Sequence, residues 1–171
     1  VGPLAATVDD TGDVFVVPAF AGLGSPWWDP YARGTIVGIT RGTGRAELAR
    51  AVVESMAYQV RGVVEAMATG AGLRLGELRV DGGASVMDLL CQFQADQLAV
   101  DVARPVNQET TALGAAYLAG LGEGVWSSPD DVAAAWAADA TFTPTADRSE
   151  ADARYATWRR AVERSRNWDL D

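Results

Sequence analysis

Apolar and polar residues recur along this chain with two different periods, which predict both strands and helices. Residues 13–20 and 34–40 are dense in β-branched and aromatic side chains, as buried strands are. Between them lies a loop, residues 22–30, in which glycines and prolines interrupt any regular element. We expect its adjacent indoles, Trp27 and Trp28, to anchor this loop to the core.

A long segment with helical periodicity, residues 45–69, follows the second strand, and Gly70 is expected to end it. Its apolar positions recur every three or four residues, so we expect them to form one broad buried face. This stripe consists of Leu48, Val52, Met56, Val60, Val63 and Met67, widened by Ala51, Ser55 and Tyr58. Beside it, Glu54 is expected to pair with an arginine such as Arg50 or to face a cleft, rather than to act in catalysis.

Shorter elements alternate along the middle of the chain. Residues 78–80 predict a strand that runs into a glycine turn at 81–85, and residues 86–98 predict a helix. A short strand at 100–102 then leads to a helix rich in small residues at 110–121. This alternation of strands and helices predicts an α/β fold.

The last part of the chain predicts two helices separated by a loop. Ser128 is expected to cap a short helix, and Ser149 with Glu150 to begin a terminal one. Residues 139–148 contain a single proline and favour a loop on the surface of the same domain. One α/β domain is therefore expected over residues 1–171.

Composition excludes several classes of function. The net charge of −9 is spread along the chain and the arginines form no stripe, which argues against nucleic-acid binding. No apolar run approaches the ~20 residues of a membrane span, so a soluble protein is expected. The single cysteine, Cys91, has no disulfide partner, and the chain has 0 histidines, so neither a disulfide framework nor a metal site is expected. A reducing cytoplasm fits this composition.

The glycine turn after residue 80 is the main candidate for a binding site. Gly82 and Gly83 lie between a strand and a helix, where missing Cβ atoms let the backbone approach a ligand and helix amides receive phosphate. The same dipeptide also occurs in connections that bind nothing. Asp81 is expected to fix the turn by accepting backbone hydrogen bonds rather than to act as a base or metal ligand.

Two motifs resemble a known family. Residues 78–85, Leu-Arg-Val-Asp-Gly-Gly-Ala-Ser, resemble the adenosine motif of the actin-like ATPase fold as carried by the FGGY family of carbohydrate kinases. Residues 34–39, followed by Glu47-Leu48 and then by residues 51–54, are similar to the second signature of that family. The resemblance extends over nearly the whole chain.

Within the family, residues 20–30 and 109–116 are similar to the glycerol kinase branch rather than to pentulose kinases. The resemblance implies the C-terminal lobe of an actin-like (ribonuclease H-like) fold, with residues 1–171 forming an incomplete domain that lacks the N-terminal lobe and the start of its own lobe. It also implies that ATP lies between the two lobes with Mg²⁺. Glycerol or a related polyol would be held by the absent lobe, so the chain alone is expected to be inactive.

Carried over by position, the resemblance places Gly83 beside the nucleotide, with Gly82 and Ala84 completing the turn. Where glycerol kinases commonly have an asparagine near the adenine, this chain has Met87, which we expect to pack against the purine and to relax base selectivity. A methionine on the helix surface is the alternative. No catalytic residue is expected here, because the aspartate base of the family lies in the N-terminal region.

Other readings fit the same residues. Another FGGY kinase, acting on a pentulose or gluconate, shares these motifs. A free-standing nucleotide-binding or oligomerisation module would instead use the terminal helices and exposed tryptophans as an interface. Residues 108–111 are expected to cap the small-residue helix through Thr110 and to help the lobes pack on closure, and a homo-oligomer is compatible with the sequence.

Overall fold

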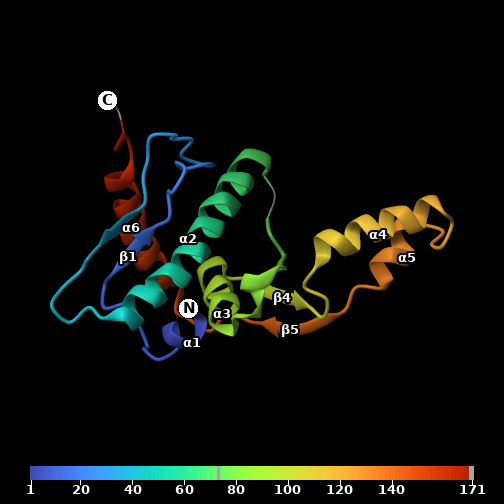
Figure 1. Cartoon of the computed structure of the whole chain (residues 1–171), viewed down its shortest axis with the longest axis horizontal. Coiled ribbons are helices and arrows are strands. Elements are labelled where there is room, and N and C mark those ends of the chain that lie inside the picture. The colour runs from blue at the N-terminus through green and yellow to red at the C-terminus, as the bar shows by residue number, and fades with distance from the viewer. Residues whose placement is uncertain (73, 170–171) are drawn as a thin grey trace.

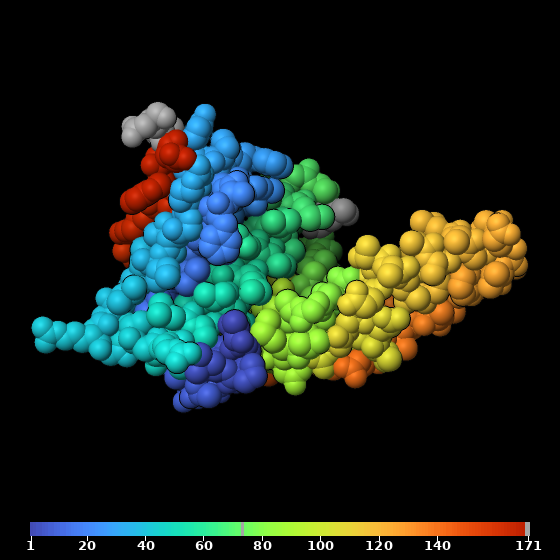
Figure 2. Space-filling view, in the orientation of Figure 1, coloured from blue at the N-terminus to red at the C-terminus, as the bar shows by residue number. Residues whose placement is uncertain are grey.

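The structure, a computed structural model that describes residues 1–72 and 74–169, has an α/β body from which a helical arm projects (Figures 1 and 2). Its helices are α1 (Gly2–Ala5), α2 (Arg45–Ala71), α3 (Asp88–Leu98), α4 (Thr110–Gly122), α5 (Pro129–Ala134) and α6 (Arg148–Ser165). Its strands are β1 (Phe15–Val17), β2 (Thr35–Val37), β3 (Glu77–Arg79), β4 (Asp101–Pro105) and β5 (Ala138–Phe142), and a 3₁₀ turn, η1, covers Gly83–Val86. No helix of the described residues is both long and apolar enough to cross a membrane.

The strands of the described chain form two small sheets. β1 and β2 pair antiparallel, whereas β3 runs parallel to β4 and β4 runs antiparallel to β5. The loop predicted for residues 139–148 is wrong in its first part, because Val102 pairs with Phe142 and Ala103 with Thr141. β4 offers a free edge whose backbone groups require partners, and β5 supplies them.

α2 lies at the centre of the body, between α6 with β1 on one side and α3 on the other (Figure 1). Its first turn is closed by Glu47, whose carboxylate accepts from the backbone N–H of Gly44 at 2.8 Å. The predicted stop at Gly70 falls two residues early: the helix runs to Ala71, and Gly72, with a left-handed φ of 65°, caps its C-terminal end.

The predicted buried face of α2 is wrong at several positions. Val52 and Val63 are each 37% exposed and Met67 is 64% exposed. The buried residues of the helix are Ala51, Val53, Glu54, Ser55, Ala57, Tyr58, Arg61 and Gly62. Small side chains allow close approach here, since a Cβ at Gly62 would lie only 3.0 Å from the Trp27 ring. The buried face of α2 is therefore turned partly away from the predicted stripe, and close packing on small residues outweighs the burial of the larger aliphatic side chains.

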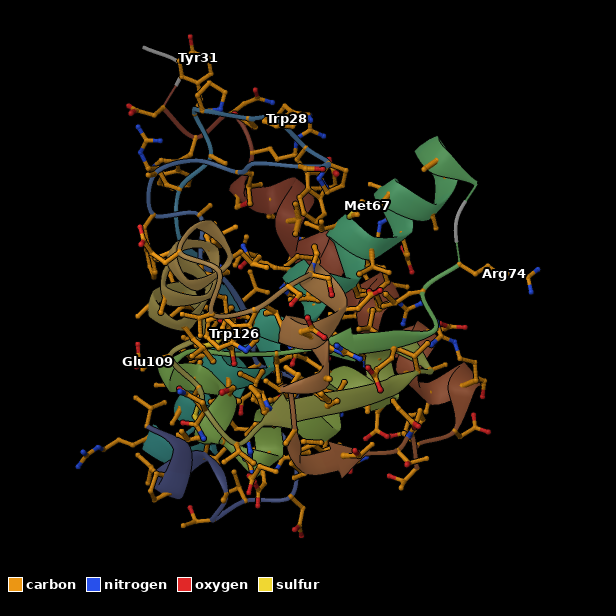
Figure 3. The ribbon with its side chains drawn as sticks, turned by 90° about the vertical axis from the view of Figure 1, so that its right-hand side faces the viewer. Trp28, Tyr31, Met67, Arg74, Glu109 and Trp126 are labelled. Carbon is orange, nitrogen blue, oxygen red and sulfur yellow. The ribbon has the colours of Figure 1, made fainter. Side chains whose placement is uncertain are left out.

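An aromatic cluster joins α2, α6 and the loop after β1. The rings of Tyr58 and Tyr155 stack on Trp158 at 5.5 and 5.9 Å, and Trp27 meets Trp158 edge-on at 5.5 Å. The predicted anchor is confirmed for Trp27. It is wrong for Trp28, which is 76% exposed and lies on the outer loop (Figure 3).

The same loop is tied down by a buried carboxylate that the sequence did not reveal. Asp29 accepts hydrogen bonds from the backbone N–H groups of Tyr31 (2.9 Å), Ala32 (3.1 Å) and Asn167 (2.9 Å). Burial raises the pKa of Asp29, but these three amides and the charge of Arg166 outweigh it and hold the pKa below its usual value. The loop and the end of α6 are thereby joined through one side chain.

The terminal helices begin close to the predicted positions. Ser128 caps α5 by accepting from the N–H of Asp131 at 3.3 Å, as expected. α6 is capped by Asp147 rather than by Ser149, because the Asp147 carboxylate accepts from the N–H groups of Ser149 (2.9 Å) and Glu150 (3.2 Å).

α4 and α5 form the projecting arm. The chain leaves the sheet at Val106 and returns at Ala137, where the two backbones are joined by an N–H to carbonyl bond of 3.0 Å. Within the arm Tyr117 meets Trp126 edge-on at 5.1 Å, and that indole covers Gly120 so closely that a Cβ there would collide with it. The loop after α4 therefore packs back onto α4 through Trp126, and the arm projects away from the body (Figure 1).

Candidate functional site

The turn between β3 and α3 exposes its glycine backbone. The N–H of Gly82 donates to the carbonyl oxygen of Gln108 at 2.9 Å, which fixes the start of the turn. Gly82 has φ 76° and ψ 177°, a conformation essentially restricted to glycine. A Cβ added to Gly82 or Gly83 would meet no atom within 4 Å. The turn thus offers backbone that a ligand can approach.

α3 does not begin directly at these glycines. Gly83–Val86 form the 3₁₀ turn η1, Met87 has an extended backbone, and α3 starts at Asp88. The helix predicted for residues 86–98 therefore begins two residues late, and the amides nearest the glycines belong to η1 rather than to α3.

Three of the four candidate residues lie in the turn itself, and the fourth follows it. Gly82, Gly83 and Ala84 are consecutive in the turn, and Gly83 and Ala84 are exposed. Met87 follows them and is partly buried, with its Cγ and Sδ directed at α1: each would lie 3.0 Å from a Cβ added to Gly2. Its thioether joins an apolar cluster of α1, α2 and α3.

Two residues around the turn act differently from expectation. Asp81 accepts a hydrogen bond from the hydroxyl of Thr110. The predicted N-cap role of Thr110 is therefore wrong, since Glu109 occupies the cap position of α4 without a side-chain cap bond. Asp81 and Thr110 instead fasten the start of α4 to the turn, a contact between segments that sequence spacing could not reveal.

Ser85 supports the turn from within the body. It is 3% exposed, and its hydroxyl and N–H donate to the carbonyl of Gly82 at 2.7 and 3.0 Å. The carbonyl of Ser85 in turn accepts from Arg104 (3.1 Å) and from the Cys91 thiol (3.3 Å). Burial raises the pKa of that thiol, which keeps it in the protonated, donating form.

An apolar pocket of about 470 Å³ lies next to this turn, between α4 and the segment that enters β5. It is lined by Pro105, Val106, Asn107, Thr110, Leu113, Gly114, Tyr117, Ala135, Trp136 and Ala137. Trp136 is held from the side of β3, where the Arg79 guanidinium stacks on its ring at 4.1 Å. The pocket and the turn share Thr110 as a common border.

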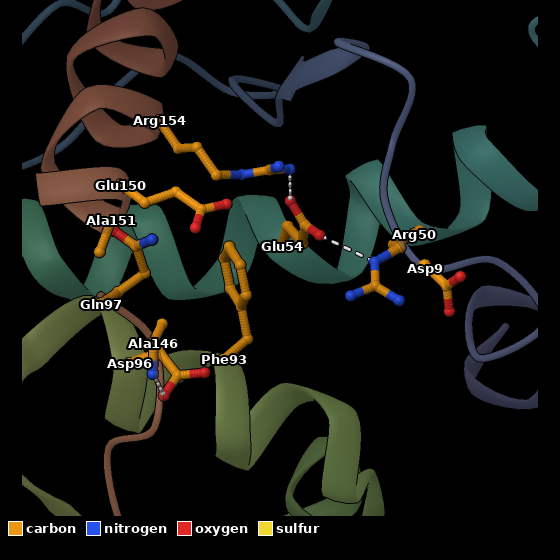
Figure 4. Close-up of a pocket in the computed structure, with 10 residues that line it drawn as sticks. All are labelled: Asp9, Arg50, Glu54, Phe93, Asp96, Gln97, Ala146, Glu150, Ala151 and Arg154. Atoms are coloured by element: carbon orange, nitrogen blue, oxygen red, sulfur yellow. Dashed lines mark hydrogen bonds and ion pairs between the residues drawn. The ribbon is translucent and has the colours of Figure 1, made fainter. Parts of the chain in front are cut away.

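A second, polar pocket of about 180 Å³ lies between α2, α3 and α6 (Figure 4). Glu54 is 2% exposed, and its two oxygens accept from Arg50 (2.9 Å) and Arg154 (3.0 Å). The predicted pairing with Arg50 is confirmed. Burial alone would lower the pKa of Arg154, but on balance that pKa is raised, chiefly by the negative charge of Glu54. Burial and the charge of Glu54 together raise the pKa of Tyr58 to about 12. Both oxygens of Glu54 are therefore engaged by arginines, which indicates a structural role for this carboxylate.

Among residues 1–72 and 74–169, no three acidic or cysteine side chains converge into a group that could hold a metal ion. Asp81 and Asp88 flank the glycine turn, but each is engaged by a neighbour, Thr110 and Arg104 respectively. The side chains near the turn therefore provide no ready cation site of their own.

Comparison with known proteins shows close relatives over the whole fold. The model for the "FGGY family of carbohydrate kinases, C-terminal domain" matches residues 3–123. The chain is 57% identical over 164 residues to the glycerol kinase of Petrotoga mobilis and 58% identical over 165 residues to that of Symbiobacterium thermophilum. Each match covers 96% of this chain but 33% of the relative, so the chain spans about a third of the length of these proteins.

Solved structures share the fold. Plasmodium falciparum glycerol kinase with ADP superposes with a TM-score of 0.85 at 34% identity, covering 96% of this chain and 33% of that chain. A xylulose kinase from Rhodospirillum rubrum gives a TM-score of 0.77 at 25% identity, covering 95% and 33%. These matches confirm the α/β lobe predicted from the sequence.

Proposed function

Since the chain belongs to the FGGY family of carbohydrate kinases, we propose that its parent enzyme transfers the γ-phosphate of ATP to glycerol and that this chain supplies part of the nucleotide-binding lobe. The observation that carries this proposal is the 57% and 58% identity to glycerol kinases over 96% of the chain. The products would be sn-glycerol 3-phosphate and ADP.

In this proposal the nucleotide lies against Gly82, Gly83 and Ala84. The open space above the two glycines supports this placement, because a phosphate or ribose can contact backbone that carries no Cβ. The fold similarity to a glycerol kinase crystallised with ADP supports it as well. The role of this chain is then to bind and orient the nucleotide.

In the transfer, the substrate hydroxyl oxygen forms a bond to the γ-phosphorus while the bond from that phosphorus to the β,γ-bridging oxygen breaks and ADP departs. The proton of the hydroxyl passes to a base in the part of the parent outside this chain. Mg²⁺ neutralises charge on the phosphates in such reactions. Its ligands would be the phosphates and groups in the part of the parent outside this chain. Because the base and these ligands would both be missing, the isolated chain is expected to be inactive.

Met87 remains a candidate contact for the purine. Its thioether packs toward α1 and is only partly buried, so in this proposal the purine would contact the part of the side chain that stays exposed. Weaker discrimination between ATP and GTP than in an Asn-bearing relative is expected. The ratio of the two nucleotide affinities, measured for the parent enzyme and for a Met87→Asn variant, tests this role.

The arm supports the proposal that residues 1–171 are one part of a larger domain. α4 carries no charged residue, and its Leu118 side chain is 72% exposed. Val106, in the segment that leads into α4, is 66% exposed. Apolar surface of this kind is usually covered in soluble proteins. We assign its cover to the remainder of the parent, since the matched relatives are about three times longer than this chain.

Compartment and assembly belong to the same proposal. The buried free thiol of Cys91 and a reaction that consumes ATP fit the cytoplasm. A homo-oligomer of the parent remains a prediction, and sedimentation of the full-length protein tests it.

The deciding experiment is a substrate profile of the full-length parent enzyme with Mg²⁺ and ATP. We expect kcat/KM to be highest for glycerol and at least about 100-fold lower for xylulose and gluconate, because a polar site built for one polyol rejects a poorly matched one strongly. Highest activity on a pentulose or on gluconate would refute glycerol as the substrate and assign the parent to another branch of the family. Nucleotide binding without any phosphotransfer would favour a binding module.

A further inference from the structure

Arg104 reaches from β4 to the underside of the glycine turn. One terminal nitrogen of its guanidinium donates to the carbonyl of Ser85 at 3.1 Å and to the carboxylate of Asp88 at 2.7 Å. These two acceptors lie on either side of Met87, in η1 and at the start of α3. A single guanidinium therefore fixes the path of the chain from the turn into the helix.

The guanidinium is itself held from the opposite side. Its Nε and other terminal nitrogen both lie 2.9 Å from the carboxylate of Asp139 in β5, and its Cζ lies 5.4 Å from the centroid of the Phe142 ring. The side chain of Arg104 is 12% exposed. Four of its neighbours thus restrict its orientation, and two of them belong to β5, which lies beyond the residues that the family model matches.

The contacts extend from Arg104 to the glycines themselves. Arg104 binds the carbonyl of Ser85, and the hydroxyl of Ser85 binds the carbonyl of Gly82 at 2.7 Å. Gly82 has the restricted backbone conformation that opens the turn. Within the described residues, the hydrogen bonds and ion pairs of Arg104 go to Ser85, Asp88 and Asp139, and none goes to Gly82, Gly83 or Ala84.

We propose that Arg104 is a positioning residue for nucleotide binding, which sets the geometry of Gly82, Gly83 and Ala84 through Ser85. The inference rests on the proposed nucleotide site at this turn. Arg104 acts through protein groups only, so it is not a catalytic residue. Lysine cannot replace it fully, because one ammonium cannot reach Ser85, Asp88 and Asp139 with the geometry of a planar guanidinium.

The test compares three variants of the full-length parent enzyme. Arg104→Met removes the donors, Arg104→Lys keeps one charge, and Arg79→Met is the matched control. Arg79 also extends from a strand of this sheet and stacks on an aromatic ring, but among the described residues its one ion-pair partner is Glu77, and its side chain is 61% exposed.

We expect Arg104→Met to raise KM for ATP and Kd for ADP about tenfold, equivalent to about 1.4 kcal/mol. KM for glycerol and kcat should stay within about twofold, because the groups that perform the transfer are untouched. Arg104→Lys should recover part of the loss in nucleotide affinity, and Arg79→Met should leave it unchanged.

Two results would overturn the inference. One is a lower melting temperature of Arg104→Met with unchanged nucleotide affinity, which would make Arg104 a stabilising residue only. The other is an equal rise in KM for ATP and for glycerol, which would indicate general damage. ADP titration separates this inference from the proposed function: a parent that binds ADP in an Arg104-dependent way but does not phosphorylate glycerol would refute the substrate and keep the positioning role.

Discussion

The indole N–H of Trp158 donates to the backbone carbonyl of Val16 at 2.9 Å, across 142 positions of the chain. Trp158 is fully buried, so this bond joins the last helix to the first strand inside the aromatic cluster. The C-terminal helix is therefore part of the core of the body.

Replacing Trp158 by phenylalanine should lower the free energy of unfolding by about 2 kcal/mol or more, because the carbonyl of Val16 loses its donor and the smaller ring leaves a cavity. Urea unfolding of the full-length parent measures this. Trp168→Phe is the control: Trp168 is 73% exposed, and its replacement should change stability by less than about 0.5 kcal/mol. Equal effects of the two variants would contradict the anchoring role.

Gly82→Ala should impair both stability and nucleotide binding. A Cβ has free space there, so the cost comes from the backbone conformation, which strains an alanine by about 1–3 kcal/mol. Calorimetric titration with ADP and a thermal melt give the two readouts. Gly76 is the control: a Cβ added there also meets no atom within 4 Å, but its φ is not positive. Gly76→Ala should therefore change stability and ADP affinity little. Unchanged ADP affinity in Gly82→Ala would remove the turn from the site.

Glu54→Gln should destabilise the fold by about 3 kcal/mol, because it leaves Arg50 and Arg154 without their shared buried counter-charge. Glu65→Gln on the same helix provides a matched control. Glu65 also pairs with an arginine four residues earlier, but its side chain is 47% exposed, so its loss should cost less than about 1 kcal/mol. Similar losses for both would mean that burial of Glu54 adds nothing to its pair.

Stability should depend on pH through Asp29. Because the folded-state pKa of this carboxylate lies below its ordinary value of 3.8, its contribution is fully present above pH 3.8 and is lost as the pH falls further through the folded-state pKa. Urea unfolding at a series of pH values should show this loss in the wild type and a flatter profile in Asp29→Asn. Asp130→Asn, at an exposed position of α5, should keep the wild-type profile.

Leu118→Lys should act in opposite directions on the chain and on its parent. In the isolated chain it reduces exposed apolar surface and should lower self-association, measured by light scattering. In the full-length enzyme it should lower the melting temperature, because a charge enters a covered surface. Asp130→Lys, a polar position on the same arm, should leave the melting temperature nearly unchanged. An unaffected parent in both variants would mean that α4 stays uncovered.

Local patterns predicted the elements whose own sequence carries a strong signal. The strand within residues 13–20, the cap by Ser128 and the pair of Arg50 with Glu54 depend on neighbours within a few positions, and the structure confirms them. The glycine turn was found in the same way, from a dipeptide placed between a strand and a helix.

Contacts between distant segments were not predictable. α2 has aliphatic side chains on more than one face, so periodicity could not tell that the smaller residues around Gly62 face α6 and the loop of Trp27. β5 is short and polar on one side, and only its pairing with β4 makes it a strand. Arg104 was missed for the same reason, since its partners come from η1, α3 and β5.

The arm leaves and re-enters the body at one point, where Val106 and Ala137 are bonded side by side. Thr110 is fastened to the turn through Asp81. The pairing of the sheet strands therefore does not fix the length or the fold of the segment between Thr110 and Ala137. The family model stops matching at residue 123, inside this excursion. A change in the length of the outer arm can therefore leave the pairing of β4 with β5 and the shape of the glycine turn intact, even where it alters the surface that the arm offers to the rest of the parent.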